Sequence, residues 1–168
     1  RLDLPSVPVL LSPISRASAQ AVAPVLKWNK ARAATSYRVQ LATDSYFPVA
    51  VVDTTVVGDT AVQIGSALQT VSPLVNNTTY FWRVMSSNRL GNSDFTLPFN
   101  FTTVIATPVP QAPANGAVDQ LTHNLEFRWN AVAGARSYVF QLATDTGFTS
   151  VVKRDSLFTG TSTVAESL

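Results

Sequence analysis

Apolar and polar residues alternate in several short segments of the chain. Residues 37–41 read Tyr-Arg-Val-Gln-Leu, and residues 80–84 read Tyr-Phe-Trp-Arg-Val. An alternation with a period of two predicts β-strands that have one buried and one exposed face. Clusters of Pro, Gly, Asn and Asp separate these segments and predict turns between the strands.

The pattern predicts seven strands in the first part of the chain. They cover residues 8–12, 22–29, 36–43, 49–56, 61–64, 79–87 and 96–103. No segment keeps the period of 3.6 residues that an amphipathic helix requires. Seven short strands within about 100 residues predict an antiparallel β-sandwich, in which two sheets bury their inner faces against each other.

The sequence repeats itself at an offset of 101 residues. The segment Gln-Leu-Ala-Thr-Asp at 40–44 recurs at 141–145. Without gaps, residues 26–47 and 127–148 are identical at 11 of 22 positions. A repeat of this length is the size of a domain, so we predict two copies of one folding unit.

The offset also predicts where the units begin and end. We predict a complete first domain over residues 1–104 and a second, incomplete domain over residues 105–168. With an offset of 101, the second unit is expected to continue to about residue 205, beyond the 168 residues given. The counterparts of residues 80–84 would then fall at 181–185, so the second unit is expected to lack its last two strands.

Three features together resemble fibronectin type III domains. They are Trp28 on the second predicted strand, Tyr37 on the third, and residues 74–80, which read Leu-Val-Asn-Asn-Thr-Thr-Tyr. The last segment is similar to the family's Leu-x-Pro-x-Thr-x-Tyr corner, with Asn76 in the place of the proline. The resemblance implies a tyrosine corner, in which the ring of Tyr80 is buried and its hydroxyl bonds back to the chain.

The resemblance is to the tandem domains found in secreted and cell-surface proteins of bacteria. It implies an all-β chain of two seven-stranded immunoglobulin-like (fibronectin type III) β-sandwiches, the second without its last two strands. It implies an extracellular or cell-surface location. It is less informative about function, because one sandwich fold supports many roles.

The composition excludes several kinds of chemistry. Twelve basic and ten acidic residues leave a net charge of +2, too little for a nucleic-acid-binding surface. The chain has no cysteine, one histidine (His123, in a predicted loop) and two glutamates, Glu126 and Glu166. No apolar run approaches the roughly 18 residues of a membrane span. We therefore expect no enzymatic activity, no cofactor, no metal site, no nucleic-acid partner and no membrane insertion.

Some aspartates occupy positions that a cation could use. Asp44 and Asp145 follow the third strand of each unit, and Asp53 flanks a predicted hairpin. Calcium binds carboxylate and carbonyl oxygens, but it needs more ligands than one aspartate supplies. An aspartate that bonds to the backbone of its own turn is the interpretation we favour at all three positions.

One predicted surface combines charge with an aromatic ring. The third and sixth strands are neighbours in the sandwich, and their outward residues include Arg38, Gln40, Phe81 and Arg83. Such a face could bind a sugar ring or another protein. The alternative is a cluster that only covers the sheet. Val139 replaces Arg38 in the second unit, so the face is not repeated.

The sequence supports three hypotheses about function. The first is a non-catalytic structural, adhesion or spacer module of a larger secreted or cell-surface protein. The second is a carbohydrate-binding accessory module of a secreted hydrolase. The third is a filament or sheath subunit, completed by strands of a neighbouring chain. The predicted partners are accordingly a protein, a polysaccharide, neighbouring domains of the same chain, or a second copy joined by strand addition.

Overall fold

The structure is a computed structural model, and it describes residues 3–65 and 73–168. The chain divides into two compact units, Arg1–Val104 and Ile105–Leu168. The described residues form strands, turns and irregular segments, and none of their segments is a helix able to cross a membrane. The all-β class predicted from the sequence is confirmed.

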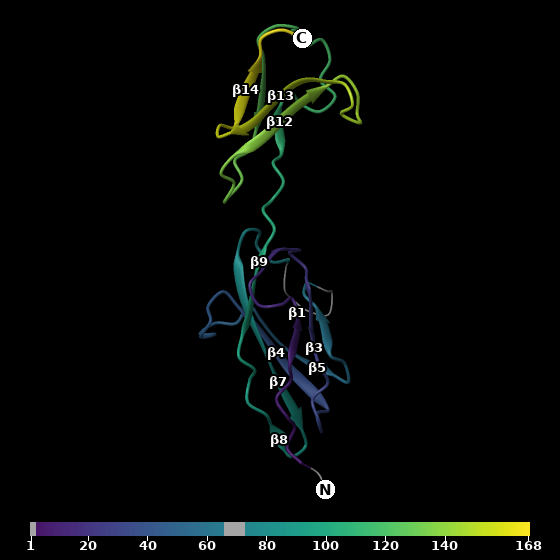
Figure 1. Cartoon of the computed structure of the whole chain (residues 1–168), viewed down its shortest axis with the longest axis vertical. Coiled ribbons are helices and arrows are strands. Elements are labelled where there is room, and N and C mark those ends of the chain that lie inside the picture. Colours follow the sequence, from purple (N-terminus) through teal and green to yellow (C-terminus); the bar gives the residue numbers. More distant parts are fainter. Residues whose placement is uncertain (1–2, 66–72) are drawn as a thin grey trace. The chain divides into compact units, whose positions relative to one another are not determined.

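Unit 1 consists of two sheets. The first has the order β1-β3-β6, and the second has the order β2-β9-β7-β4-β5, with β8 paired to β7 (Figure 1). The strands are β1 (Leu10–Ser12), β2 (Ala17–Gln20), β3 (Val25–Trp28), β4 (Ser36–Ala42), β5 (Val52–Val57), β6 (Ala61–Gln63), β7 (Thr79–Asn88), β8 (Gly91–Asn92) and β9 (Phe99–Thr103). All pairings in the two sheets are antiparallel except β2 with β9.

The seven predicted strands all have counterparts in unit 1, and the described residues add the short strands β2 and β8. Four predicted strands begin two or three residues too early, because the observed strands β1, β3, β5 and β9 begin at Leu10, Val25, Val52 and Phe99. Of these, β3 begins directly after Pro24 and β9 directly after Pro98. Proline has no backbone N–H to donate to a ladder, which explains why pairing begins only after it.

The alternating residues of β3, β4, β7 and β9 meet between the two sheets. Trp28 from one sheet contacts Tyr37 from the other, with ring centroids 5.4 Å apart in an edge-to-face arrangement. The inward side chains of the paired strands β4 and β7 are almost completely buried. The core includes Leu26, Trp28, Tyr37, Val39, Leu41, Tyr80, Trp82, Val84 and Phe101. The period of two in the sequence therefore marks the buried face, as predicted.

The tyrosine corner is present in unit 1. The Val75 amide donates a hydrogen bond to the Tyr80 hydroxyl at 3.0 Å, and the Tyr80 side chain is buried. Asn76, which stands where the family has proline, donates from its side-chain amide to the Val104 carbonyl at 3.1 Å. That bond ties the corner to the end of β9 and compensates for the missing proline ring. Unit 1 therefore has a fibronectin type III-like fold.

Unit 2 repeats part of this arrangement. Its sheets have the orders β10-β11-β14 and β12-β13 (Figure 1). The strands are β10 (Pro110–Ala112), β11 (Leu125–Trp129), β12 (Tyr138–Ala143), β13 (Val151–Phe158) and β14 (Ser162–Ala165). The sequence repeat makes β11 the counterpart of β3 and β12 the counterpart of β4.

The repeat preserves local geometry as well as sequence. The Ala31 amide donates to the Tyr37 hydroxyl at 2.9 Å, and the Val132 amide donates to the Tyr138 hydroxyl at the same distance. Trp129 and Tyr138 also meet edge to face, with centroids 5.6 Å apart. The same residues thus anchor the two sheets to each other in both units.

Candidate functional site

The outward residues of β4 lie at the centre of a ladder of polar side chains. In the register of the sheet, Gln40 faces Asp53 on β5 and Arg83 on β7. Arg38 is two residues earlier on β4, so its side chain emerges on the same face. Directly opposed side chains in a sheet are close enough to bond across strands. The register therefore brings four polar side chains from three strands together.

These four side chains form a continuous hydrogen-bonded network. The Arg38 guanidinium donates through Nε and Nη2 to the two carboxylate oxygens of Asp53, at 2.7 and 2.6 Å. Gln40 donates through Nε2 to Asp53 Oδ2 at 2.8 Å, and its Oε1 accepts from Arg83 Nε at 2.9 Å. The two-pronged Arg38–Asp53 pair is the strongest geometry available to a guanidinium and a carboxylate.

Two phenylalanine rings enclose the end of this network. The guanidinium carbon of Arg83 lies 4.1 Å from the ring centroid of Phe47 and 4.2 Å from that of Phe95. Phe47 comes from the turn after β4, and Phe95 from the segment between β8 and β9. Both distances are well within the roughly 6 Å of an effective cation–π contact. Arg83 is therefore held by a hydrogen bond along the sheet and by a ring in each of two loops.

The turn that positions Phe47 is part of the sequence repeat. Asp44 Oδ1 accepts from the Tyr46 amide at 2.7 Å, and the Asp44 carbonyl accepts from the Phe47 amide at 3.2 Å. Asp145 in unit 2 makes the same carbonyl bond to Phe148, also at 3.2 Å. Phe47 and Phe148 both have positive φ angles, 58° and 52°. Each aspartate therefore serves its own turn, as the sequence predicted.

The side chain of Asp145 accepts three hydrogen bonds from backbone amides of its own turn. Its oxygens accept from the amides of Gly147 at 3.0 Å, Thr149 at 3.1 Å and Ser150 at 2.6 Å. The hydrogen bonds from Thr149 and Ser150 are the main reason that the pKa of Asp145 lies below its usual range. Three backbone amides thus hold the Asp145 carboxylate within its own turn.

The unit 1 network contains two positive charges, on Arg38 and Arg83, and one negative charge, on Asp53. The hydrogen bond from Arg38 lowers the pKa of Asp53, and the same bond raises the pKa of Arg38. Burial is the largest influence on Arg83 and lowers its pKa, with the nearby positive charge of Arg38 acting in the same direction. A guanidinium nevertheless stays protonated at neutral pH. The network consists of the Arg38–Asp53 ion pair, which the Gln40 side-chain amide links to the guanidinium of Arg83.

The structure brings three of the four predicted surface residues into one network, namely Arg38, Gln40 and Arg83. It differs from the prediction at Gln40, which is only 8% exposed because the side chains bonded to it cover it. Phe81 is half-buried on the same face of β7, opposite Ala42 in the register. The rings that stack on Arg83 come from two loops instead.

Sequence reasoning missed Phe47, Phe95 and Asp53 as members of the cluster. Asp53 was expected to bond to the backbone of its own turn, but it lies within β5, as the predicted strand 49–56 implies, and its carboxylate bonds to the side chains of Arg38 and Gln40. Its place opposite Gln40 depends on the register of β4 and β5, which the sequence alone did not fix. Phe47 did give a signal, because it lies in the repeated segment. Nothing around Phe95 indicated that its loop folds over β7.

The remaining candidates for catalysis or metal binding are the histidine and the acidic side chains. The described residues contain no group of three or more His, Asp or Glu side chains that could hold a metal ion. His123 is exposed in the segment between β10 and β11. In unit 2, the side chains of Glu126 and Arg128 pair at 2.8 Å. The carboxylates of Asp53, Asp145 and Glu126 thus bond to neighbouring side chains or to the backbone.

Unit 2 contains a different feature, an open groove of about 300 Å³. Its apolar walls come from the inner faces of β11 and β12. They include Phe127, Trp129, Tyr138, Phe140 and Leu142. These inner-face residues are half-buried, whereas Trp28, Tyr37 and Leu41, which correspond to three of them, are at most 3% exposed in unit 1.

Comparisons with known proteins find similar structures but no sequence relative. No family model and no curated protein matches the chain. Among solved structures, "FN3tt mut" is 19% identical, with a TM-score of 0.39, over 61% of this chain and 97% of that one. The FN1–FN3 domains of chicken CNTN1 are 14% identical, with a TM-score of 0.40, over 95% of this chain and 56% of that one.

An α-L-rhamnosidase from Streptomyces avermitilis, solved with L-rhamnose, is also similar. It is 23% identical, with a TM-score of 0.46, and the match covers 82% of this chain. The chain spans only 14% of the length of that enzyme.

Proposed function

We propose that the chain is a non-catalytic structural module of a larger secreted or cell-surface protein, in which it acts as a spacer or holds other parts for display or adhesion. The observation that carries this proposal is the closed network on the outward face of unit 1. Arg38, Gln40, Asp53 and Arg83 bond to one another across three strands. Such a network reinforces the sheet.

The network differs from a ligand-binding site in how it uses its polar groups. A binding site presents donors and acceptors that only the ligand satisfies. Here both Asp53 oxygens and the Gln40 carbonyl oxygen already have partners. A ligand that bound these oxygens would have to break these bonds, and each group left without a partner would cancel much of the binding energy.

The repeat of sandwich units is the second support for a spacer. A short segment, residues 104–109, joins β9 of unit 1 to β10 of unit 2, and it contains Pro108 directly before the strand that begins at Pro110. Proline-rich connections are stiffer than connections rich in glycine and serine. The location outside the cell follows from the resemblance to tandem domains of secreted and surface proteins, and it is part of the proposal.

Force spectroscopy tests the mechanical role directly. The chain is held at both ends and pulled, and unit 1 is expected to unfold in one cooperative event. Strands β1 to β9 then release roughly 300 Å of chain, at about 3.5 Å per residue. A Trp28→Ala variant serves as the control and should unfold at a lower force. Gradual extension of unit 1 without a distinct event would contradict the proposed mechanical role.

A binding titration separates structure from recognition at the network. The Arg83→Gln variant is compared with the unaltered chain over a panel of soluble polysaccharides. A structural role predicts a lower melting temperature for unit 1 and no measurable binding by either protein. Binding by the unaltered chain that disappears in Arg83→Gln, with the melting temperature unchanged, would mean that the face is a recognition site.

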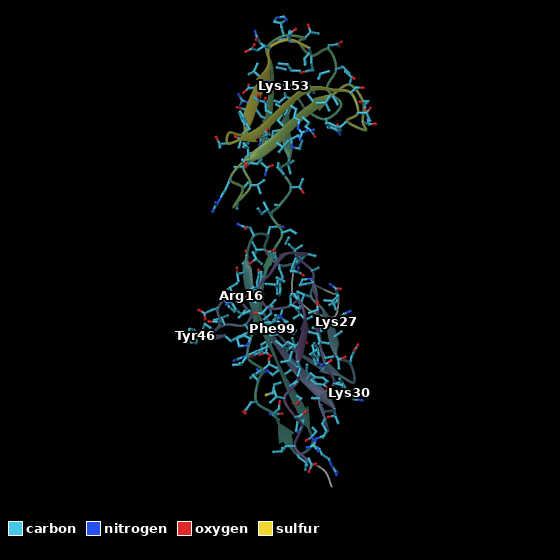
Figure 2. All side chains as sticks on the ribbon, in the orientation of Figure 1. Arg16, Lys27, Lys30, Tyr46, Phe99 and Lys153 are labelled. Atoms are coloured by element: carbon cyan, nitrogen blue, oxygen red, sulfur yellow. The ribbon has the colours of Figure 1, made fainter. Side chains whose placement is uncertain are left out.

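One observation favours carbohydrate binding as a second candidate function. The side chain of Tyr46, in the turn that also carries Phe47, is 88% exposed, and it points away from the strands of unit 1 (Figure 2). An exposed aromatic ring can stack on a sugar. This candidate predicts polysaccharide binding that Tyr46→Ala abolishes and Tyr46→Phe retains. Binding that Tyr46→Ala leaves unchanged would mean that the Tyr46 ring does not contact the sugar.

A further inference from the structure

The polar network of unit 1 leaves one group of donors without an acceptor. Arg38 donates to both oxygens of Asp53, and Arg83 donates through Nε to Gln40. Among the residues that the structure describes, none accepts a hydrogen bond from Nη1 or Nη2 of Arg83 or forms an ion pair with them. These two nitrogens carry most of the N–H groups of a guanidinium. The edge of Arg83 that fits a carboxylate is therefore open.

The network also has an excess of positive charge. Its two cations, Arg38 and Arg83, share one carboxylate, and both oxygens of that carboxylate accept from Arg38. Burial is the main reason that the pKa of Arg83 lies below its ordinary value, and the charge of Arg38 acts in the same direction. A negative charge at the open edge of Arg83 would offset both effects.

Two rings hold the Arg83 side chain in place. Phe47 and Phe95 pack against its guanidinium carbon from a loop on each side of β7, while its Nε is bonded to Gln40. A side chain that is already held in one position loses little conformational entropy when it binds a ligand. The rings also displace water from the cation, which strengthens an ion pair formed at its edge. Arg83 is therefore preorganised to bind an anion.

The loops that supply these rings also carry the most exposed large apolar side chains of the described residues. Tyr46, in the turn after β4, and Leu97, in the segment before β9, are each 88% exposed. The side chain of Tyr46 points away from the strands of unit 1 (Figure 2). The segment with Leu97 runs beside β7, because the Thr96 amide donates to the Val84 carbonyl at 2.9 Å. The cation of Arg83 thus has an exposed apolar side chain in the loop on either side.

We infer that this face of unit 1 binds a polypeptide segment in which one aspartate or glutamate stands between apolar side chains. The carboxylate accepts two parallel hydrogen bonds from Nη1 and Nη2 of Arg83. The apolar side chains of the segment cover Tyr46 and Leu97. In an extended segment they stand two residues before and two residues after the acid, because alternate side chains point to the same side. This recognition goes beyond the proposed spacer role, which does not depend on it.

The face fits a polypeptide better than an acidic polysaccharide. A sugar stacks on the free face of an aromatic ring, but Phe47 and Phe95 already pack against Arg83. Leu97 is aliphatic and offers no flat face. Apolar side chains of a polypeptide can cover both Leu97 and Tyr46, whereas the hydroxyl groups of a sugar would lose water there without gaining partners. An acidic polysaccharide is therefore the competing ligand that the experiment has to separate.

The test uses the full chain and a synthetic peptide, acetyl-Ser-Leu-Ser-Glu-Ser-Leu-Ser-amide. The control peptide has glutamine in place of the glutamate. NMR spectra follow the Nε–H signal of Arg83, which we expect to shift and saturate as the glutamate peptide is added. The glutamine peptide should bind at least fivefold more weakly, because a charge-assisted hydrogen bond is about twice as strong as a neutral one. Added salt should weaken the binding of the glutamate peptide.

Two variants of the chain test the apolar contacts. Tyr46→Ser and Leu97→Ser change side chains that are 88% exposed, so both variants should unfold like the unaltered chain. Each should bind the glutamate peptide roughly two- to fivefold more weakly, as expected for the loss of one partly buried apolar contact. Val57→Thr is the matched control. Val57 is 78% exposed but lies opposite Ser36 at the start of β4, so this variant should bind the peptide like the unaltered chain.

Several results would overturn the inference. An Arg83 signal that does not move at millimolar peptide, or equal affinity for the glutamate and glutamine peptides, would mean that the face does not recognise a carboxylate. Displacement of the peptide by a soluble polyuronate that binds more tightly would make an acidic polysaccharide the ligand. A shift of the Arg83 signal with chain concentration alone would make a second copy the occupant. The force measurement on unit 1 tests the spacer role independently of all these results.

Discussion

The two units place the same residues in different environments. Trp28 and Tyr37 in unit 1 and Trp129 and Tyr138 in unit 2 have almost the same ring separation, 5.4 and 5.6 Å. The pair in unit 1 is nearly inaccessible, at 1% and 3% exposure, whereas the pair in unit 2 is half-buried. The fully buried apolar residues of unit 2 are only Val132 and Ala165.

This difference separates two levels of information in the repeat. The contacts within 26–47 and within 127–148 are local, so each copy of the sequence builds them alike. Burial depends on β7 and β9, whose residues lie 30 or more positions further along the chain in unit 1. A repeated segment therefore specifies the geometry of its own strands, while the strand that packs on it determines how stable that geometry is.

Replacing the two equivalent tryptophans should change stability the most, and it tests this conclusion. Trp28→Ala should destabilise unit 1 by about 3–5 kcal/mol, because a fully buried ring is replaced by a cavity. Trp129→Ala should destabilise unit 2 by less than half of that, because part of the ring already contacts solvent. Denaturant-dependent hydrogen exchange, resolved by segment, measures the two effects in the same chain.

One result would contradict this difference between the two units. Equal losses at Trp28 and Trp129 would mean that the groove is closed in solution and that unit 2 has a complete core. A substitution at the exposed Val57, such as Val57→Thr, serves as the control and should change unit 1 by less than about 0.5 kcal/mol.

The tyrosine hydroxyls give the next effect. Tyr37→Phe removes the acceptor of the Ala31 amide, which is buried, and should cost about 1–1.5 kcal/mol. Tyr138→Phe removes the same bond at Val132, but water reaches the half-buried Tyr138 more easily and can replace it. We expect a loss of about 0.5 kcal/mol there. A larger loss in unit 2 than in unit 1 would contradict this order.

Much of unit 1 could be predicted from the sequence. The period of two identified the inward faces of β4 and β7 because large apolar side chains recur there at every second position, as Tyr37, Val39 and Leu41 on β4 and Tyr80, Trp82 and Val84 on β7. The segment 74–80 predicted the bond to the Tyr80 hydroxyl because the corner is a local motif. Residues 66–72 lie outside the described residues, and no prediction depended on them.

The candidate site was less predictable because it depends on register and on loops. Arg38, Gln40 and Arg83 could be placed on one face from their parity along the strands. That Gln40 bonds to both Asp53 and Arg83 required the pairing of β4 with β5 and with β7. Phe95 reaches Arg83 through an irregular segment with no pattern. The alternation of inward and outward side chains along a strand is encoded locally, but the register between strands and the path of a loop are not.

Phe47 and Phe148 occupy equivalent positions of the repeat, so replacing each one tests the same difference between the units. Phe47→Ala removes one of the two rings on Arg83 and should destabilise unit 1 by about 1 kcal/mol. Phe148→Ala removes the equivalent ring, which is 52% exposed, and should change unit 2 by less than about 0.5 kcal/mol. Thermal unfolding of the two variants measures both.

The smallest expected effect concerns pH and Asp53. The hydrogen bond from Arg38 lowers the folded-state pKa of Asp53 below its unfolded value of about 3.9. A lowered folded-state pKa means that the contribution is fully present above the unfolded pKa and is lost as the pH falls through the folded pKa. The Asp53 side chain is 36% exposed, so water screens the pair and the contribution is about 0.5 kcal/mol.

Asp53→Asn should therefore lower the stability of unit 1 slightly at pH 7 and flatten its decline below about pH 4, where the carboxylate of the unaltered chain becomes protonated. Arg38→Gln should remove the same part of the slope, and the double variant should lose no more than either single variant. Additive losses in the double variant, measured by urea unfolding at pH 7 and pH 3, would mean that Arg38 and Asp53 act separately, and that the network on this face of unit 1 is weaker than its geometry indicates.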